Sequence, residues 1–246
     1  MSRHSKWSKV KQFKGAIDAK RSASFTKLAR VITVEAREKG GDPEMNAGLR
    51  AAIGRAREAS MPKDAIERAI QKGAGGGEEG RIESLIYEAY APGGTALIIE
   101  SLTDNRNRTA GEIKHLLTKA GGSLAASGSV TYLFDHLAVV RAPTPSSSPS
   151  ERGRGLSNEM ELTLIDAGAA NMIEVDGGIE IQAATKDLSA VSEAATKLGL
   201  TVTSAEFEWI AKSLVEVDEE SGSKAAELID ELENHDDVSR VFHNLG

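Results

Sequence analysis

Residues 95–120 read TALIIESLTDNRNRTAGEIKHLLTKA and contain the clearest structural signal in the chain. The apolar run at 95–102 is typical of a buried strand, whereas the apolar residues after it recur at helical spacing. Thr109 and Glu112 are three residues apart, as in a capping box, which predicts a helix over 109–120. The sequence therefore predicts a buried strand that a short polar turn joins to a helix.

The segments on either side of this unit add strands, not a repeating strand–helix alternation. LIYEAYA at 85–91 precedes the unit and VTYLF at 130–134 follows it, and both read as strands. The order strand, strand, helix, strand differs from a doubly wound parallel fold and fits split βαβ units. Further strands are predicted around 137–142, 171–176, 179–183, 201–205, 206–217 and 238–243, and further helices around 157–168, 187–198 and 223–234.

These elements predict an α+β protein in which an N-terminal three-helix bundle precedes two ferredoxin-like-type α+β modules. The last strand–helix–strand would complete the module that begins at residue 85, so the central module is predicted to be discontinuous and the other to be inserted in it. The predicted divisions are a basic tail at 1–21, a three-helix domain at 22–73, a glycine-rich hinge at 74–84, a central domain at 85–135 plus 206–246, and an inserted domain at 136–205.

Three amphipathic helices account for the segment at 22–73. The first ends at Gly40-Gly41, and Asp42 is predicted to cap the second helix with Pro43 at its first position. Met45 begins the predicted buried stripe of the second helix, and Gly73 closes the third. The outer faces carry the basic residues Lys27, Arg30, Arg37, Arg50 and Arg57.

Charge is distributed unevenly along the chain, although the formal net charge is only −7. Residues 1–72 contain 17 Lys and Arg against 8 Asp and Glu, a net of +9, and the rest of the chain carries −16. A cationic head on an acidic body favours a phosphate-bearing partner. The alternative is a chain whose oppositely charged halves attract each other.

The first 21 residues supply most of this positive charge. They lack the apolar core of a secretory signal, but their basic, Ser-bearing composition also fits a mitochondrial transit peptide or an amphipathic helix on a membrane or polyanion. Because unpaired Lys side chains are costly to bury, we expect a tail that is mobile alone and ordered by a phosphate-rich partner. Its candidate contacts are Arg3, His4, Lys6, Trp7, Lys9, Lys11, Lys14, Lys20 and Arg21.

The polar turn at 103–109 is the second candidate for phosphate binding. It places Arg106 and Arg108 where a buried strand meets a helix N-terminus, whose free N–H groups attract anions. Two guanidinium groups can fork onto phosphate oxygens. The alternative is a capping turn, in which the Asn and Asp side chains satisfy local backbone groups.

No motif of a catalytic, metal or cofactor site is present. The chain has no Cys, its five His residues are scattered, and no apolar run is long enough to span a membrane. GGGEEG at 75–80 matches G-x-G-x-x-G, but a predicted helix precedes it and a strand follows it, the reverse of a dinucleotide fingerprint. The acidic clusters at 218–220 and 231–237 are predicted to be solvated. We expect no catalytic residue, metal or cofactor, and a hydrolase whose carboxylates meet only in space is the open alternative.

Several motifs resemble the YebC/PmpR family over nearly all of residues 1–135, whereas the carboxy-terminal half is similar mainly in pattern. The linker PTPSSSPSERGRG at 143–155 differs from the shorter, more acidic connection expected in the family. The motifs that carry the resemblance are HSKW at 4–7, DAKR at 18–21, FTKL at 25–28, GGDP at 40–43, MPKDAIERAI at 61–70, YEAYAPGG at 87–94, LTDNRNRT at 102–109 and GSVTYLF at 128–134.

The resemblance implies a cytoplasmic protein with a three-helix domain and two α+β domains around a cleft. Members of the family are described both as DNA-binding transcriptional regulators and as translation factors that engage the ribosome and relieve stalling, notably on proline-rich chains. Mitochondrial relatives activate translation. Because the HSKW motif begins at residue 4, the resemblance leaves little room for a transit peptide.

We therefore expect a non-enzymatic, nucleic-acid-binding regulator of gene expression with no membrane partner and an unknown oligomeric state. Ribosomal RNA, reached on the ribosome, and duplex DNA are the two candidate targets. Sequence-specific DNA readers usually present a recognition helix, often in a symmetric dimer, and the sequence shows neither, which favours RNA. A protein-interaction adaptor, whose acidic body binds a basic partner, is a further alternative.

Overall fold

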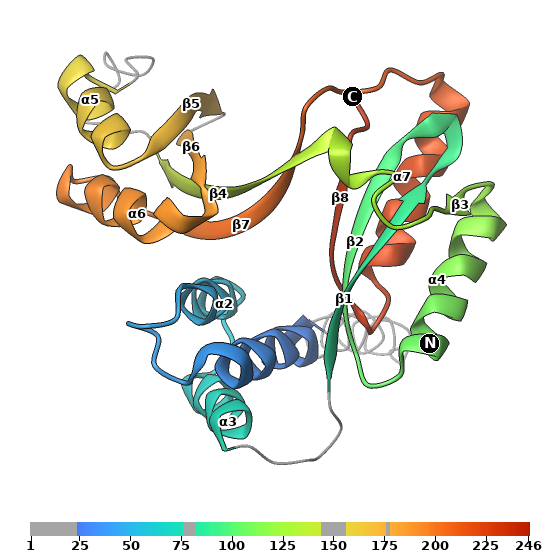
Figure 1. The fold of residues 1–246 in the computed structure, drawn as a ribbon, viewed down its shortest axis with the longest axis horizontal. Coiled ribbons are helices and arrows are strands. Elements are labelled where there is room, and N and C mark those ends of the chain that lie inside the picture. The colour runs from blue at the N-terminus through green and yellow to red at the C-terminus, as the bar shows by residue number, and fades with distance from the viewer. Residues whose placement is uncertain (1–23, 76–81, 144–155, 176–177) are drawn as a thin grey trace, which may run out of the picture.

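The computed structural model describes residues 24–75, 82–143, 156–175 and 178–246. A helical domain and two antiparallel four-stranded sheets with their helices form three bodies (Figure 1), and side chains of all three line a central hollow. The predicted α+β class, with N-terminal helices before two sheets, is confirmed. Within the described ranges, no helix is long and apolar enough to cross a membrane.

The helical domain packs its helices closely through small residues. A Cβ at Gly73 would lie 2.3 Å from the carbonyl oxygen of Thr33, so only glycine lets the third helix approach the first at this point. Leu49 and Ile32 are fully buried between the helices, in agreement with the amphipathic helices predicted for this segment. The helices are a first helix at 24–39, α2 (Ala47–Glu58) and α3 (Lys63–Ala74).

The second helix begins at Ala47, not at Pro43 as predicted. Its cap is Asn46, whose Oδ1 accepts a hydrogen bond from Leu49 N at 2.9 Å, while its amide nitrogen donates to two backbone carbonyls near the end of the first helix. Met45, predicted to be buried, is 83% exposed. The buried Asn46 side chain ties both ends of the connection together, which an Asp42 cap could not do.

The first sheet combines segments from before and after the second sheet in the chain. Its order is β3-β1-β2-β8, and β2 is buried on both faces. Helices α4 and α7 cover the face that carries Leu97 and Ile99, and Phe134 packs on the opposite face against Ile98. The elements are β1 (Glu83–Tyr90), β2 (Ala96–Thr103), α4 (Arg106–Ala120), β3 (Ser123–Leu124), α7 (Glu219–Glu233) and β8 (Val238–His243).

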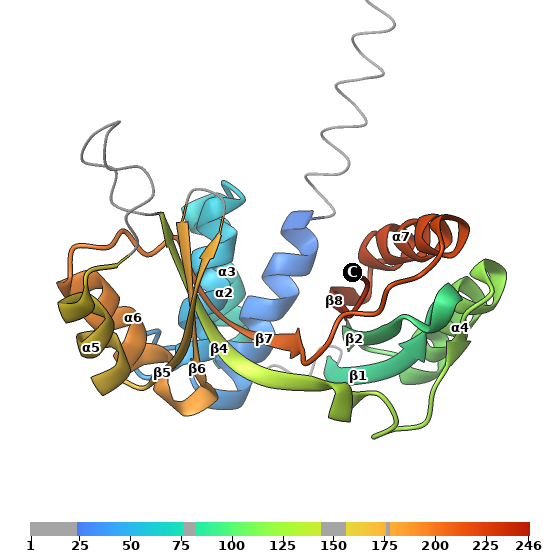
Figure 2. The ribbon, with the colours of Figure 1, turned by 90° about the horizontal axis from the view of Figure 1, so that it is seen from above.

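The second sheet has the order β5-β6-β4-β7, and its chain order βαββαβ gives two interlocked split βαβ units. Strands β4 and β7 run on from this module toward the first sheet and so connect the two bodies (Figures 1 and 2). The elements are β4 (Phe134–Pro143), α5 (Asn158–Asp166), β5 (Ala169–Val175), β6 (Gly178–Ala184), α6 (Leu188–Lys197) and β7 (Ser204–Ala211).

Strand β7 corrects the predicted boundary at residue 205. The sequence assigned residues 206–246 to the central domain, but β7 (Ser204–Ala211) pairs with β4 from Arg141 to Phe134 and so belongs to the second sheet. The strands predicted at 201–205 and 206–217 are this single strand. The predicted hinge also starts and ends inside regular elements, because Ala74 lies in α3 and β1 begins at Glu83.

The strand predicted at 130–134 is wrong because a buried carboxylate binds this segment. Glu88, 5% exposed on β1, accepts hydrogen bonds from the backbone N–H groups of Gly128, Val130 and Thr131. Burial alone would raise the pKa of Glu88, but these hydrogen bonds outweigh it and lower the pKa. The chain turns around the carboxylate as a 3-10 helix, and β4 begins only at Phe134.

Candidate nucleic-acid interface

The predicted contact residues fall into two groups. Seven are described, and they lie on the first helix, on α2 and at the start of α4. The nine predicted contacts of the tail lie outside the described residues: Arg3, His4, Lys6, Trp7, Lys9, Lys11, Lys14, Lys20 and Arg21.

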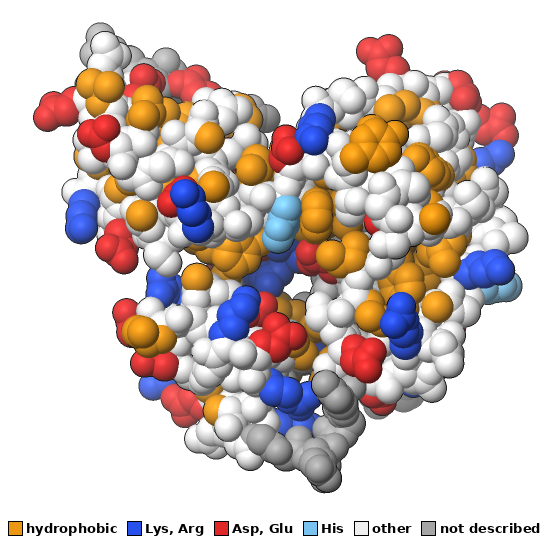
Figure 3. Space-filling view, in the orientation of Figure 1, with side chains coloured by type: hydrophobic (Ala, Val, Ile, Leu, Met, Phe, Trp, Pro, Cys, Tyr) orange, Lys and Arg blue, Asp and Glu red, His pale blue; other side chains and the backbone are white. Residues whose placement is uncertain are grey.

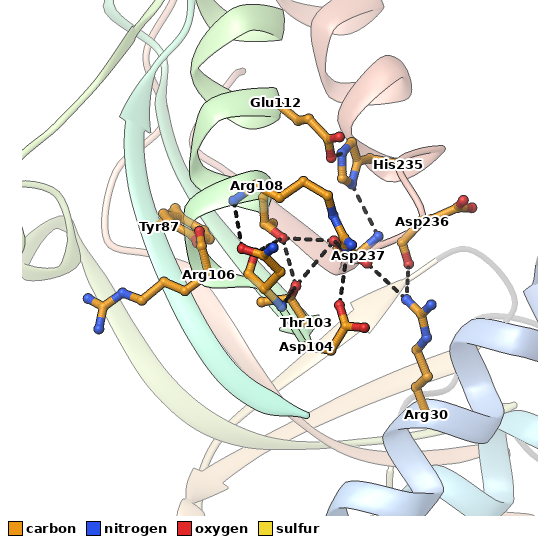
Figure 4. A network of polar contacts seen from close by, with 12 residues as sticks. Arg30, Tyr87, Thr103, Asp104, Arg106, Arg108, Glu112, His235, Asp236 and Asp237 are labelled. Atoms are coloured by element: carbon orange, nitrogen blue, oxygen red, sulfur yellow. Dashed lines mark hydrogen bonds and ion pairs between the residues drawn. The ribbon is translucent and has the colours of Figure 1, made fainter. Parts of the chain in front are cut away.

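The turn before α4 is a capping turn. Asn105 is the cap, and its Oδ1 accepts a hydrogen bond from Arg108 N at 3.1 Å. The helix therefore starts at Arg106, and the capping box predicted at Thr109 is wrong. The side chain of Arg106 is exposed, extends away from the neighbouring polar network, and makes no hydrogen bond or ion pair with any described residue (Figure 4).

Arg108 belongs to a polar network centred on Asp237, which is 4% exposed. The Asp237 Oδ2 accepts from Arg108 and from the Thr109 hydroxyl, both at 2.7 Å, and its Oδ1 accepts from Arg30 at 3.0 Å. Its backbone carbonyl accepts from Leu102 N at 2.8 Å. The first helix, β2, α4 and the turn before β8 thus converge on one carboxylate.

This network accounts for the low pKa of Asp237. Burial would raise the pKa, but hydrogen bonds from Arg108 and Thr109, the charge of Arg108 and the hydrogen bond from Arg30 lower it to about 2. Asp237 is therefore charged throughout the physiological range. The sequence placed it in a solvated acidic cluster, which is wrong for this residue, because its burial depends on partners more than 100 positions away along the chain.

The first helix is fastened to the end of α7 by the same set of contacts. Lys27 Nζ donates to the carbonyl of Glu233 at 2.5 Å, and Arg30 also donates to the carbonyl of Asp236 at 3.0 Å. A cation is favourable at the C-terminal end of a helix. The described chain begins at residue 24, which is less than two helical turns before Arg30 of the Asp237 network.

The other predicted arginines differ in how far they are engaged. Arg50 donates to the carbonyls of Pro43 and Glu44 and to the Ser189 hydroxyl of α6, at 2.8–3.1 Å. The side chains of Arg37 and Arg57 make no hydrogen bond or ion pair within the part of the chain that the structure describes. Exposed ion pairs also occupy the basic residues Lys63 and Arg68 of α3. None of the described helices of this domain thus presents an uninterrupted basic face.

Sequence reasoning missed the polar side chains that line the central hollow. Arg55 of α2 and Arg240 of β8 face Glu206 of β7, at 3.7 and 2.9 Å. His136 and Trp209 lie directly opposite each other on β4 and β7, and their rings stack at 4.5 Å. The predicted boundary at 205 placed this pair in different domains, and only the strand register could have brought the two together.

The described residues contain no group of three or more His, Asp or Glu side chains placed to hold a metal ion. His235 Nε2 lies 2.9 Å from Glu112, and its Nδ1 accepts from Asp237 N at 3.1 Å. Because Nδ1 is an acceptor, the ring proton is on Nε2 and faces the carboxylate. This histidine is thus part of the Asp237 network, on the wall of the open groove that Arg30 and Arg108 also line.

Comparisons with known proteins agree along the whole chain. A family model described as the TACO1/YebC protein N-terminal domain matches residues 5–76, and one described as the TACO1/YebC second and third domain matches residues 82–245. A relative in Fervidobacterium nodosum is 47% identical and one in Rubrobacter xylanophilus 44% identical; each match covers 100% of this chain and 94% and 95% of the relative, respectively. Both are named probable transcriptional regulatory proteins.

The fold is also similar to a solved structure. A crystal structure of a conserved hypothetical protein from Aquifex aeolicus is 40% identical and superimposes with a TM-score of 0.80. The match covers 94% of this chain and 92% of that chain, so it includes the helical domain and both sheets.

Proposed function

The chain belongs to the TACO1/YebC family, and on this premise we propose that it is a non-enzymatic, nucleic-acid-binding regulator of gene expression. The names of its relatives, probable transcriptional regulatory proteins, support a regulatory role. The proposed place of action is the cytoplasm, with nucleic acid as the partner.

The observation that carries the proposal is the separation of charge. Residues 1–21 contain seven Lys and Arg against one Asp, whereas the chain beyond residue 72 carries −16. Several cations of the described helical domain are already paired, among them Arg30, Arg50 and Arg68. We therefore infer that the tail is the main group of cations that neutralises phosphates and releases their counterions.

We further propose structured RNA on the ribosome as the target, and relief of stalled translation as the role. The absence of an uninterrupted basic face on the described helices argues against a helix that enters the DNA major groove. The family resemblance adds the translation role. Duplex DNA is the second candidate, and the names of the relatives favour it.

The tail is tested by replacing Lys9, Lys11, Lys14, Lys20 and Arg21 together with Gln. If about six phosphates are neutralised, the log–log dependence of affinity on salt has a slope of roughly −4 to −5. Removal of the five tail cations should flatten that slope by about 3 to 4. Binding is measured on RNA at several salt concentrations, and circular dichroism checks the fold.

A matched control removes five cations elsewhere, from exposed ion pairs: Lys63, Arg68, Lys119, Lys197 and Lys224. The control should leave the slope within about one unit of the original protein. Equal flattening in both variants would show that only net charge matters and would refute the role of the tail.

The two targets are separated by co-sedimentation with ribosomes and by mobility shift of promoter and random duplex DNA, all at the same salt concentration. The ribosome proposal predicts sedimentation with ribosomes under conditions where neither DNA is shifted. Preference for the promoter over both random DNA and ribosomes would establish the transcriptional alternative.

A further inference from the structure

The central hollow contains a cleft of about 240 Å³ that no part of the proposed function uses. All three bodies contribute to its wall, and the space-filling view shows basic and acidic side chains side by side in the hollow (Figure 3). The residues that matter for its chemistry are Glu35, Arg55, Glu100, His136, Phe207 and Arg240.

One wall of the cleft is aromatic. The exposed ring of His136 stacks on Trp209 with an interplanar angle of 21°, and the Phe207 ring lies 6.1 Å from it at 52°. The Trp209 indole N–H donates to Glu100 at 3.2 Å, which holds the ring behind His136. Partial burial lowers the pKa of His136 below its ordinary value, which favours the neutral imidazole and its flat, uncharged surface.

The helical domain adds to the same cleft polar atoms without hydrogen bonds. Glu35 Oε2 and Arg55 Nε are buried and make no hydrogen bond to any described residue. Their nearest opposite charges are Lys39 Nζ at 3.6 Å from Glu35 and Glu206 Oε1 at 3.7 Å from Arg55. The Glu35 and Arg55 side chains are nevertheless 26% and 23% exposed, so a ligand in the cleft can offer a donor to the carboxylate and an acceptor to the guanidinium.

The position of Glu35 depends on a glycine. Gly48 lies in the first turn of α2, and a Cβ there would stand within 2.1 Å of the Glu35 Oε2. Alanine has a higher helix propensity than glycine, so the local helix gains nothing from glycine at this position. What glycine supplies is the space that lets the Glu35 carboxylate lie against α2 at the cleft.

The charges around the cleft do not favour a phosphate as the ligand. Arg240 is already bonded to Glu206 at 2.9 Å and to the Phe207 carbonyl at 2.9 Å. Four carboxylates outnumber three cations on the wall: Glu35, Glu38, Glu100 and Glu206 against Lys39, Arg55 and Arg240. A neutral ligand that both donates and accepts hydrogen bonds fits these surroundings better than an anion.

We propose that the cleft binds one unpaired nucleobase of single-stranded nucleic acid, stacked on His136 with its hydrogen-bonding edge toward Glu35 and Arg55. Every nucleobase is flat and carries both donors and acceptors along its edge. The phosphates stay outside the acidic cleft, where the basic tail can neutralise them. An arginine side chain from a protein partner would satisfy Glu35 but would offer no acceptor to Arg55. The inference rests on the proposed function and specifies its ligand.

The test uses a Trp7→Phe background, because the chain has two tryptophans and this change leaves Trp209 as the only reporter. Short single-stranded RNA and an abasic ribose-phosphate oligomer of equal length are titrated at the same salt concentration. The RNA should bind more tightly and alter Trp209 emission, and the abasic oligomer should bind without altering it. His136→Ala should weaken RNA binding about 5- to 150-fold, the range expected for loss of one stacked base.

Three further variants make the result specific. His136→Phe keeps a stacking surface and should retain most of the affinity, whereas His115→Ala changes an exposed histidine of α4 outside the cleft and should have no effect. Gly48→Ala should displace the Glu35 carboxylate and lower the preference for RNA over the abasic oligomer without lowering stability.

The outcomes distinguish this inference from the proposed function. Equal binding of RNA and the abasic oligomer, with no change in Trp209 emission, would refute the nucleobase site. Phosphate binding by the tail would then remain possible. Failure of both oligomers to bind would overturn both proposals. If an arginine-rich peptide changed Trp209 emission and RNA did not, the cleft would be a site for a protein partner, and the proposed nucleobase site would be refuted.

Discussion

The Asp237 network and the central cleft are two polar junctions of the same helical domain, and they differ in hydrogen-bond satisfaction. Both bring an arginine of that domain against carboxylates of a sheet module. At Asp237, each side-chain oxygen accepts at least one hydrogen bond of 3.0 Å or shorter. In the cleft, Glu35 Oε2 and Arg55 Nε have none.

The comparison separates residues that hold the domains together from residues available to a ligand. A satisfied buried carboxylate fixes the geometry of the elements around it, and its partners have little left to offer a phosphate. Polar groups that lack hydrogen bonds make ligand binding more favourable when the ligand supplies those bonds. Arg108, which looked like a phosphate ligand in the sequence, therefore belongs to the first class.

The largest change in stability is expected for Asp237→Ala. It leaves Arg30 and Arg108 without their shared partner, and it also removes an acceptor from the buried Thr109. Because both arginines are partly exposed, at 34% and 44%, water can recover some of the loss. We expect the free energy of unfolding to fall by about 2–3 kcal/mol in urea titrations.

The neighbouring Asp236 gives a matched control. Its side chain is exposed, and only its backbone carbonyl contacts Arg30, so Asp236→Ala keeps that hydrogen bond. Its effect on stability should be within about 0.5 kcal/mol of zero. Equal losses in the two variants would mean that the network does not hold the domains together.

Acid should weaken the Asp237 network selectively. The folded-state pKa of about 2 lies below the ordinary value of 3.8, so the stabilisation is complete above pH 4 and is lost as the pH falls toward 2. The advantage of the original protein over Asp237→Asn should shrink by about 2 kcal/mol across that window. Other carboxylates titrate in both proteins and cancel in the difference. Parallel stability curves would contradict the depressed pKa.

The sequence predicted those features that local periodicity determines. The inward faces of the helices and the buried strand at 95–102 follow from apolar spacing, and Ile32 and Leu97 are fully buried. The predicted first residues of helices and strands were wrong where contacts with other parts of the chain determine them. Asn46 caps α2 because it reaches back to Glu35 and Gly40, and Phe134 begins β4 because Glu88 binds the preceding residues.

The candidate site was less accessible to sequence reasoning, for the same physical reason. A buried Asp and a solvated Asp look alike in an acidic stretch, so Asp237 gave no local signal. His136 and Trp209 become a pair only through the register of β4 and β7. The arginines at 106 and 108 were recognisable as a pair, but their separate roles depend on which one reaches Asp237.

The smallest expected stability effects separate Arg106 from Arg108. Arg108→Ala removes ion pairs to Asp237 at 2.7 Å and Asp104 at 3.0 Å, so it should lower the urea midpoint, though less than Asp237→Ala does. Arg106→Ala removes no hydrogen bond or ion pair to a described residue and should leave the midpoint unchanged.

For nucleic-acid binding the order should be reversed, with the larger effect for Arg106→Ala. Loss of a free cation reduces the salt slope by roughly one unit, which we expect for Arg106 and not for the paired Arg108. A reduced slope with Arg108→Ala alone would show that a phosphate displaces Asp237, and the Asp237 network would then itself be a binding site.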